Sequence, residues 1–235
     1  MLFAWQQGRQ FWQSFINILF PPRCGGCRQP GSLWCETCQS GVVAVHAPIC
    51  EMCGQPYVST GLCSSCRVQP LQIELIRSAA LFHGPLRQAI HRFKYERLSG
   101  LAEPLGKLLV DYWQALGLWA DWLIPVPLHP ARERERGYNQ SALLARQVAC
   151  ATGIPLLEHG LQRTRATAVQ MKLNAAQRKQ NVAGAFACYE PGVKAKRVVV
   201  VDDVCTTGAT LDACAAAVLK AGAASVVGLT LARTP

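Results

Sequence analysis

One stretch constrains this chain more than any other: four consecutive valines from Val198, two aspartates, a loop of small hydroxyl residues and an alanine-rich segment. Four valines in a row predict a strand that is buried on both faces, as in the interior of a parallel sheet. The residues from about Ala209 to Lys220 predict a helix after the loop. Strand, loop and helix in this order form one unit of an α/β fold. We therefore expect a parallel sheet of about five strands with flanking helices.

The loop after the strand carries a distinctive set of hydrogen-bonding groups. One glycine among small residues lets backbone N–H groups turn toward a common point, and the following helix strengthens this anion site. Three threonine hydroxyls add donors, whereas the two aspartates accept hydrogen bonds from vicinal hydroxyls. No Gly-Lys-Ser/Thr follows the glycine, so the loop is not a P-loop. The pattern favours a ribose 5-phosphate. The predicted binding residues are Asp202, Asp203, Cys205, Thr206, Thr207, Gly208, Ala209 and Thr210.

This string resembles the phosphoribosyl-pyrophosphate (PRPP) motif of type I phosphoribosyltransferases. The alternative is an ordinary buried strand followed by a capped helix. That alternative does not account for two acids directly after four valines, or for three threonines within five positions.

Eight of the twelve cysteines lie in four Cys-x-x-Cys pairs within residues 24–66. Clustered pairs are typical of metal sites, which persist in a reducing compartment. Four thiolates in each half suit a structural Zn²⁺ and leave no open position for catalysis. We expect two consecutive zinc ribbons; a cross-braced pairing, one vestigial site or disulfides are the alternatives. The predicted ligands are Cys24, Cys27, Cys35, Cys38, Cys50, Cys53, Cys63 and Cys66.

Three segments make up the expected organisation. Residues 1–22 predict an amphipathic helix, which either packs on the protein or docks on a membrane surface or a partner. Residues 23–69 form the cysteine-rich module, and residues 70–235 form the α/β domain. No run reaches transmembrane length, and the opening segment lacks the basic start and cleavage site of a signal peptide. We therefore expect a cytoplasmic protein.

Local patterns place further elements in the α/β domain. Strands are expected over 75–83, 122–127, 183–189 and 224–231, and helices from Pro85 to about Arg97 and over 101–116. Residues 128–141 combine three arginines with a glycine, an aromatic and an amide, which indicates a site loop rather than a solvated turn. Asn139 is expected to cap a helix that runs to about Ala151.

The chain is basic, with a net charge of +10. Residues 129–181 hold nine Lys+Arg and three Asp+Glu, a local charge of 9 − 3 = +6. Such charge suits pyrophosphate or nucleic acid and predicts weak, salt-sensitive binding of single-stranded DNA. Within this stretch, residues 161–182 are expected to form either a solvated basic helix or a mobile loop that closes over PRPP.

Five strings occur in a specific order. Four Cys-x-x-Cys pairs precede Phe-Lys-Tyr, Val-Pro-Leu with Arg-Gly-Tyr-Asn-Gln-Ser, Arg-Thr-Arg-x-Thr-x-x-Gln and Val-Asp-Asp-Val-x-Thr-Thr-Gly-x-Thr. This order resembles the ComF/GntX family, also called competence protein F, from Cys24 almost to the C-terminus. The resemblance implies a zinc-ribbon head and a type I phosphoribosyltransferase fold. It also implies, in some bacteria, a role in taking up single-stranded DNA, with proteins of the competence machinery as candidate partners.

The resemblance also implies roles for individual residues. Asp202 and Asp203 would hold the ribose hydroxyls, directly or through Mg²⁺ and water, and the leaving pyrophosphate would need Mg²⁺. Lys94, Arg163 and Arg165 would offset the pyrophosphate charge and complete the catalytic set.

Two departures from better-known phosphoribosyltransferases narrow the range of reactions that we expect. Thr206 stands where purine-salvage enzymes place an aspartate, and the first cysteine lies inside the metal cluster rather than at the N-terminus. Purine salvage and glutamine hydrolysis are therefore disfavoured. We expect a PRPP-binding, phosphoribosyltransferase-like protein of the competence type with an unassigned acceptor. The alternative is a non-catalytic single-stranded-DNA-binding or adaptor protein.

Overall fold

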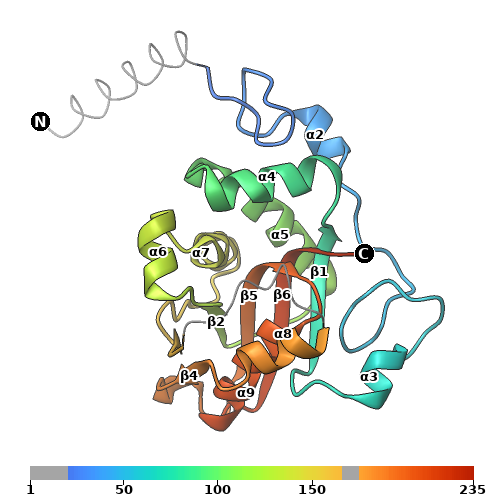
Figure 1. Ribbon diagram of the computed structural model, residues 1–235, viewed down its shortest axis with the longest axis vertical. Coiled ribbons are helices and arrows are strands. Elements are labelled where there is room, and N and C mark those ends of the chain that lie inside the picture. Colours follow the sequence, from blue (N-terminus) through green and yellow to red (C-terminus); the bar gives the residue numbers. More distant parts are fainter. Residues whose placement is uncertain (1–20, 166–174) are drawn as a thin grey trace, which may run out of the picture.

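The computed structural model describes residues 21–165 and 175–235. The helix expected over 1–22 falls outside these ranges, apart from its last two positions. Four strands form a central parallel sheet, with helices on both faces (Figure 1). Their order is β1 (Leu75–Leu81), β6 (Ser225–Arg233), β5 (Arg197–Cys205) and β2 (Trp122–Pro125). The α/β fold with a parallel sheet is therefore confirmed.

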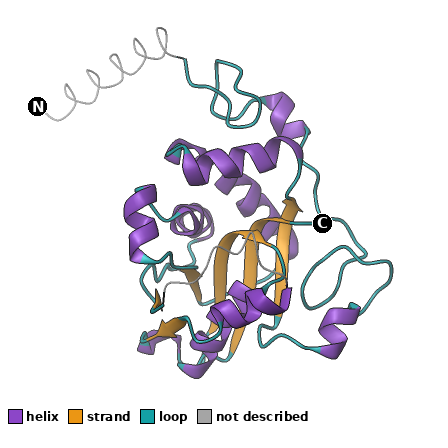
Figure 2. Ribbon diagram, in the orientation of Figure 1, coloured by secondary structure: helices purple, strands orange, loops and turns teal. Residues whose placement is uncertain are grey.

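The four valines explain why helices cover both faces of this sheet. Successive side chains of a strand point to opposite faces. Val199 and Val201 enter a core with residues of α4, α5 and α7, whereas Val198 and Val200 enter a second core with residues of α9. Figure 2 shows these helix layers on either side of the sheet. The bounds are α4 (Gly84–Tyr95), α5 (Ala102–Leu116), α7 (Gln140–Thr152) and α9 (Ala209–Lys220).

Two expectations about strands are corrected. The segment expected as a strand over 183–189 contains β4 (Phe186–Cys188), which pairs antiparallel with β3 (Leu161–Arg163) in a separate ribbon. The parallel sheet of the described residues therefore has four strands rather than about five. In addition, β5 does not stop at the valines but continues through both aspartates, because its backbone stays paired with β6 as far as Cys205.

The segment expected as a site loop over 128–141 contains a short helix, α6 (Pro130–Arg136). His129 starts this helix, because its Nδ1 accepts a hydrogen bond from the backbone N–H of Ala131 at 3.3 Å. The predicted cap of the next helix is confirmed: Asn139 Oδ1 accepts from the N–H of Ser141 at 3.0 Å. Of the expected loop over 161–182, residues 166–174 lie outside the described ranges, and α8 (Ala175–Val182) follows them.

Other segments cover both outer edges of the sheet. At the β1 edge, the N–H of Leu81 donates to the carbonyl of Val43 at 2.8 Å. At the β2 edge, the N–H of Leu157 donates to the carbonyl of Leu123 at 2.9 Å. Within the two described ranges, no helix has both the length and the apolar character needed to span a bilayer. The short elements are α2 (Glu36–Ser40), α3 (Ser64–Val68), and the 3₁₀ turns Ser99–Leu101 and Pro191–Val193.

Candidate functional site

An ion pair joins the end of α4 to the end of β5. The Lys94 amine lies 2.7 Å from Oδ2 of Asp203, and only 3% of the Asp203 side chain is exposed. A buried carboxylate without a partner would cost several kcal/mol, on the order of a broken buried ion pair. Lys94 therefore compensates the charge of Asp203, and two residues that sequence reasoning assigned separately to pyrophosphate and ribose lie in direct contact.

Asp202 is also buried, but its partners are neutral. Its Oδ1 accepts hydrogen bonds from the Ser141 hydroxyl at 2.8 Å and from the N–H of Asp203 at 2.9 Å. Burial, reinforced by the neighbouring charge of Asp203, raises the pKa of Asp202 to about 7, although Lys94 and Ser141 act in the opposite direction. Sequence reasoning missed the role of Ser141; its place two residues after the helix cap Asn139 was the available signal.

The Arg-Gly-Tyr-Asn-Gln-Ser segment holds α4 and α7 together beside this pair. The Tyr138 hydroxyl donates to the carbonyl of Phe93, and their rings lie 5.6 Å apart between centroids. The Arg136 guanidinium lies 5.3 Å from the ring centroid of Tyr95 and donates to the side chain of Gln140. These contacts fix the end of α4, where Lys94 is located.

The predicted anion loop joins β5 to the start of α9. Gly208 adopts a φ of 80°, and a Cβ there would lie 2.8 Å from Cδ1 of Ile76. The positive φ favours glycine at this position, and the close Ile76 side chain would have to move to admit a Cβ. Thr206 and Thr207 are half-buried, so their hydroxyls remain near the surface of the site. Cys205 is a core residue: burial raises the pKa of its thiol to about 11. The binding roles assigned to this loop stay predictions.

The two predicted arginines have different surroundings. The Arg163 guanidinium lies 5.4 Å from the ring centroid of Phe186. Burial lowers its pKa and the charge of Arg132 lowers it further, whereas Asp202 raises it. Arg163 is therefore within electrostatic reach of Asp202. Arg165 instead donates to the carbonyls of Asn181 and Ala183, each at 3.1 Å.

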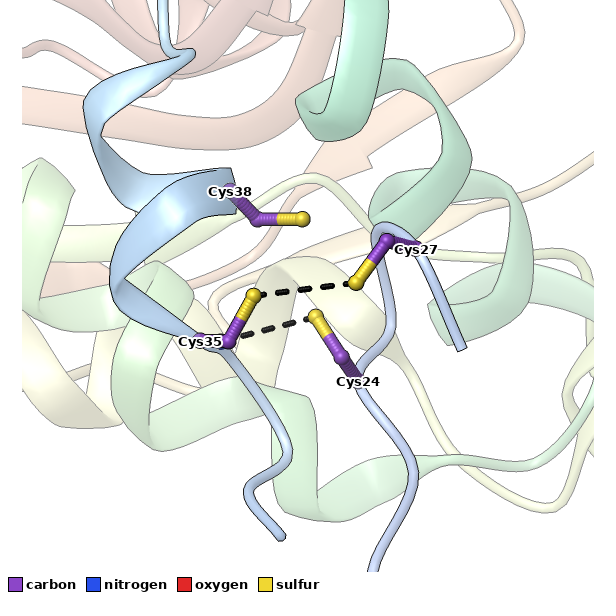
Figure 3. Close-up of side chains that lie close together, drawn as sticks. All are labelled: Cys24, Cys27, Cys35 and Cys38. Carbon is purple, nitrogen blue, oxygen red and sulfur yellow. Dashed lines mark hydrogen bonds between the residues drawn. The ribbon is translucent and has the colours of Figure 1, made fainter. Parts of the chain in front are cut away.

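The first metal site consists of Cys24, Cys27, Cys35 and Cys38 (Figure 3). Their sulfur atoms all lie within 4.8 Å of one another. Backbone N–H groups of Gly26 and Cys35 donate to the Cys24 sulfur, both at 3.4 Å. Burial alone would raise the pKa of Cys24, but backbone donors outweigh it and lower the pKa to about 6. Four clustered sulfurs with N–H donors fit a structural Zn²⁺.

The second metal site consists of Cys50, Cys53, Cys63 and Cys66, all of them buried. The N–H of Cys63 donates to the Cys50 sulfur at 3.3 Å, and such donors overcome the effect of burial and lower the pKa of Cys50 to about 6. The eight thiols thus form two consecutive groups, which excludes a cross-braced pairing. All twelve cysteines lie in the described ranges, and each is free of disulfide bonds. The result is two zinc-binding sites, each made of four cysteines.

Comparisons with known proteins agree with this division of the chain. A double zinc ribbon domain matches residues 15–67, and a phosphoribosyl transferase domain matches residues 140–235. The DNA utilization protein YhgH of Salmonella typhimurium is 35% identical over 227 residues, covering 92% of this chain and 99% of that protein. Competence protein F of Haemophilus influenzae is 32% identical, with coverages of 94% and 99%. Competence protein ComFC of Bacillus subtilis is 28% identical, with coverages of 88% and 86%.

Proposed function

Because this chain belongs to the competence protein F family, in which a double zinc ribbon precedes a phosphoribosyltransferase domain, we propose that it binds PRPP at the carboxyl end of β5. One observation carries the proposal: Lys94, the two aspartates and the threonine-rich loop converge there. Ligands of parallel α/β sheets bind at this end of the strands.

Each part of PRPP has a chemical complement in this site. The 5-phosphate suits the N–H groups and hydroxyls of residues 206–210, at the start of a twelve-residue helix. The ribose diol donates hydrogen bonds, which suits the carboxylates of Asp202 and Asp203. The pyrophosphate suits the cation of Lys94. Binding therefore opens the ion pair between Lys94 and Asp203, because each partner exchanges the other for a group of the ligand.

A site of this kind supports pentosyl transfer. The bond between C1 and pyrophosphate breaks, the acceptor bonds to C1 of the 5-phosphoribosyl group and loses its proton, and the positioned charges of the site stabilise the separating groups. The carboxylates of Asp202 and Asp203 would hold Mg²⁺, which neutralises the leaving pyrophosphate when bound. The relatives named for competence and DNA utilization make DNA uptake the process in which we place this activity, alongside proteins of the competence machinery.

Calorimetry with PRPP and Mg²⁺ tests the binding site. Asp203→Asn and Thr207→Val should each weaken binding by about tenfold or more, since a hydrogen bond to a charged group contributes about 1.5–3 kcal/mol. Asp111→Asn, on an exposed carboxylate of α5, is the matched control and should bind as the wild type does. Wild-type affinity in both site variants would refute the assignment.

Single-stranded DNA is a second candidate ligand, favoured by an aromatic and basic surface beside the site. Tyr95 is 58% exposed and lies against Arg136. All of α6 lies in the described ranges, none of its residues is buried, and it carries three arginines and two glutamates, a net charge of 3 − 2 = +1. An exposed aromatic among arginines provides the stacking and phosphate contacts that single strands require.

Fluorescence anisotropy with labelled oligothymidine tests this candidate. Tyr95→Ala should weaken binding, whereas Tyr189→Ala, which removes a still more exposed tyrosine, should not. Affinity should fall with salt at a log–log slope of about −0.7 per neutralised phosphate. If Arg163 and Arg165 serve both ligands, PRPP should compete and the double alanine variant should weaken both. If oligothymidine does not bind even at low salt, the DNA candidate is wrong, and the two arginines remain assigned to pyrophosphate only.

A further inference from the structure

Helix α4 contacts the first metal site with one face and the ligand site with the other. Arg92 and Glu96 are four residues apart and therefore share a face of the helix. Lys94 is two residues from each, about 200° around the axis from Arg92, so it points the opposite way. Lys94 reaches Asp203, whereas Arg92 and Glu96 reach the cysteine module. A single helix thus carries both sets of contacts.

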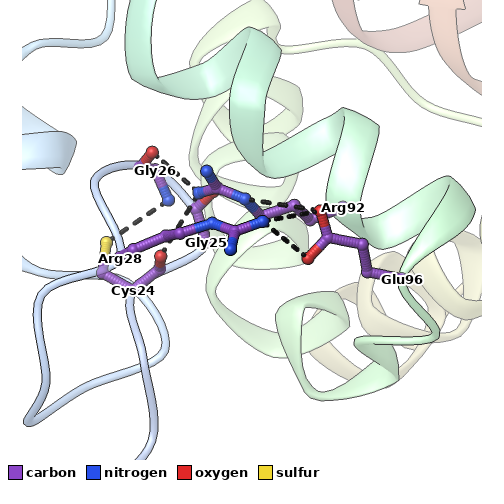
Figure 4. A network of polar contacts seen from close by, with 6 residues as sticks. All are labelled: Cys24, Gly25, Gly26, Arg28, Arg92 and Glu96. Carbon is purple, nitrogen blue, oxygen red and sulfur yellow. Dashed lines mark hydrogen bonds and ion pairs between the residues drawn. The ribbon is translucent and has the colours of Figure 1, made fainter.

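Arg92 binds the loop between two zinc ligands, which we call the first knuckle (residues 24–27; Figure 4). Its Nη1 donates to the carbonyls of Cys24 at 3.5 Å, of Gly26 at 2.8 Å, and of Gly25. These three carbonyls belong to Cys24, which is itself a zinc ligand, and to the two glycines that separate it from the next ligand, Cys27. Coordination of both ligands fixes the turn of the loop. A metal ion bound by both ligands would hold the three carbonyls in their orientation toward Arg92.

Further contacts hold the first knuckle against α4. The Arg28 guanidinium lies 3.1 Å from Oε1 of Glu96, which also pairs with Nε of Arg92 at 3.8 Å. Beyond α4, Gly25 packs so closely on Leu101 of the following 3₁₀ turn that a Cβ would lie 2.7 Å from its Cδ2. Movement of the knuckle would therefore reach the last turn of α4, where Lys94 is located.

We propose that Arg92 is a positioning residue that couples the first metal site to Lys94, so that zinc in this site strengthens PRPP binding and PRPP strengthens the binding of that zinc. The inference rests on the proposed PRPP site. The coupling is reciprocal because any binding linkage between two ligands acts equally in both directions. The metal site then regulates the ligand site through the rigid helix between them.

Calorimetry with PRPP and Mg²⁺ on Arg92→Met tests the coupling. This change keeps the aliphatic stem but removes every donor to the knuckle. The matched control is Arg87→Met, which removes the same charge from an exposed position on α4. We expect Arg92→Met to bind PRPP about fivefold more weakly or worse, in the typical range of coupling energies, while Arg87→Met stays at the wild-type value. Equal PRPP affinities in the two variants would overturn the coupling through Arg92 and would leave the proposed PRPP site intact.

A second measurement needs no change at Arg92 and has a readout that a purely structural role would not move. A colorimetric zinc chelator is titrated into the wild-type protein with and without PRPP and Mg²⁺, and the zinc that the protein retains at equilibrium is measured. The protein should hold one of its two zinc ions more tightly with PRPP, and Lys94→Met should lose this gain. Identical zinc retention with and without PRPP overturns the coupling. Failure of the wild-type protein to bind PRPP overturns the proposed function, and the coupling with it.

Discussion

The two metal sites dock on the α/β domain in the same way but on different elements. In both, carbonyls between the first two ligands accept hydrogen bonds from the domain. The first knuckle binds Arg92 of α4. The second knuckle (residues 50–53) binds the sheet: the carbonyl of Met52 accepts from the N–H of Ile76 at 2.7 Å, and that of Cys53 from Arg233 at 2.5 Å. One knuckle is thus attached to a helix and the other to a strand edge.

Burial separates the two sites further. All four thiols of the second site are buried, whereas Cys27 of the first is exposed and Cys35 half-buried. The side chain of Ile76, whose N–H binds the second knuckle, packs against Gly208 of the anion loop. Each knuckle therefore contacts an element that carries one half of the proposed ligand site. The second knuckle is hydrogen-bonded to the sheet, so loss of its metal site should destabilise the fold. Loss of the first metal site should mainly change the position of Lys94.

Replacing one ligand in each site should separate these roles with the largest effect. Cys63→Ser should lower the melting temperature by about 10 °C or more, because binding energy of a structural zinc is folding energy. Cys27→Ser should lower it by about 5 °C or less, since the first site lies on a helix face. Scanning calorimetry with zinc analysis measures both, and equal losses would remove the distinction.

One glycine at each knuckle gives a finer comparison: Gly54 directly follows the second knuckle, and Gly25 lies within the first. Gly54 has a φ of 70°, and a Cβ there would lie 2.3 Å from the backbone oxygen of Ile76. Gly54→Ala should cost about 2–3 kcal/mol of unfolding free energy from strain and overpacking. At Gly25 the nearest atoms belong to the flexible Leu101 side chain, so Gly25→Ala should cost about 1 kcal/mol. Urea unfolding measures the order, and the reverse order would contradict our account.

A smaller effect concerns Asp202 on β5, the strand that contributes to the proposed ligand site. The pKa of Asp202 is raised to about 7, above its unfolded value, so the folded chain holds an extra proton that it loses as pH rises. The contribution of this group to stability is fully present at acid pH and is lost through neutrality. Between about pH 5.5 and 8, the free energy of unfolding of the wild type should fall by about 1–2 kcal/mol relative to that of Asp202→Asn. A constant difference across this range would show that Asp202 stays charged.

Local patterns were sufficient to predict the elements that form the site. The valine run predicted the central strand, Asn139 predicted the start of helix α7, and the spacing of cysteines predicted two groups of four thiols. These features depend on neighbouring residues, which the sequence displays directly.

Contacts between distant residues were not predictable. The strand continues through Asp202 and Asp203 because Ser141 and Lys94 compensate the buried acids from other elements. Asp212, buried on α9, accepts a hydrogen bond at 2.6 Å from the N–H of Gln72, 140 residues earlier. Arg233 binds a knuckle 180 residues away. No local pattern marks such pairs, since each depends on where the finished fold brings two segments together.

The structure of the protein with PRPP and Mg²⁺ bound tests the central claim most directly. We predict that the 5-phosphate lies on the N–H groups of residues 206–210 and the ribose hydroxyls on the carboxylates of β5. Lys94 should leave Asp203 for the pyrophosphate, while Arg92 keeps its contacts with the first knuckle. PRPP bound elsewhere, or bound here with the Lys94–Asp203 pair still closed, would contradict the account.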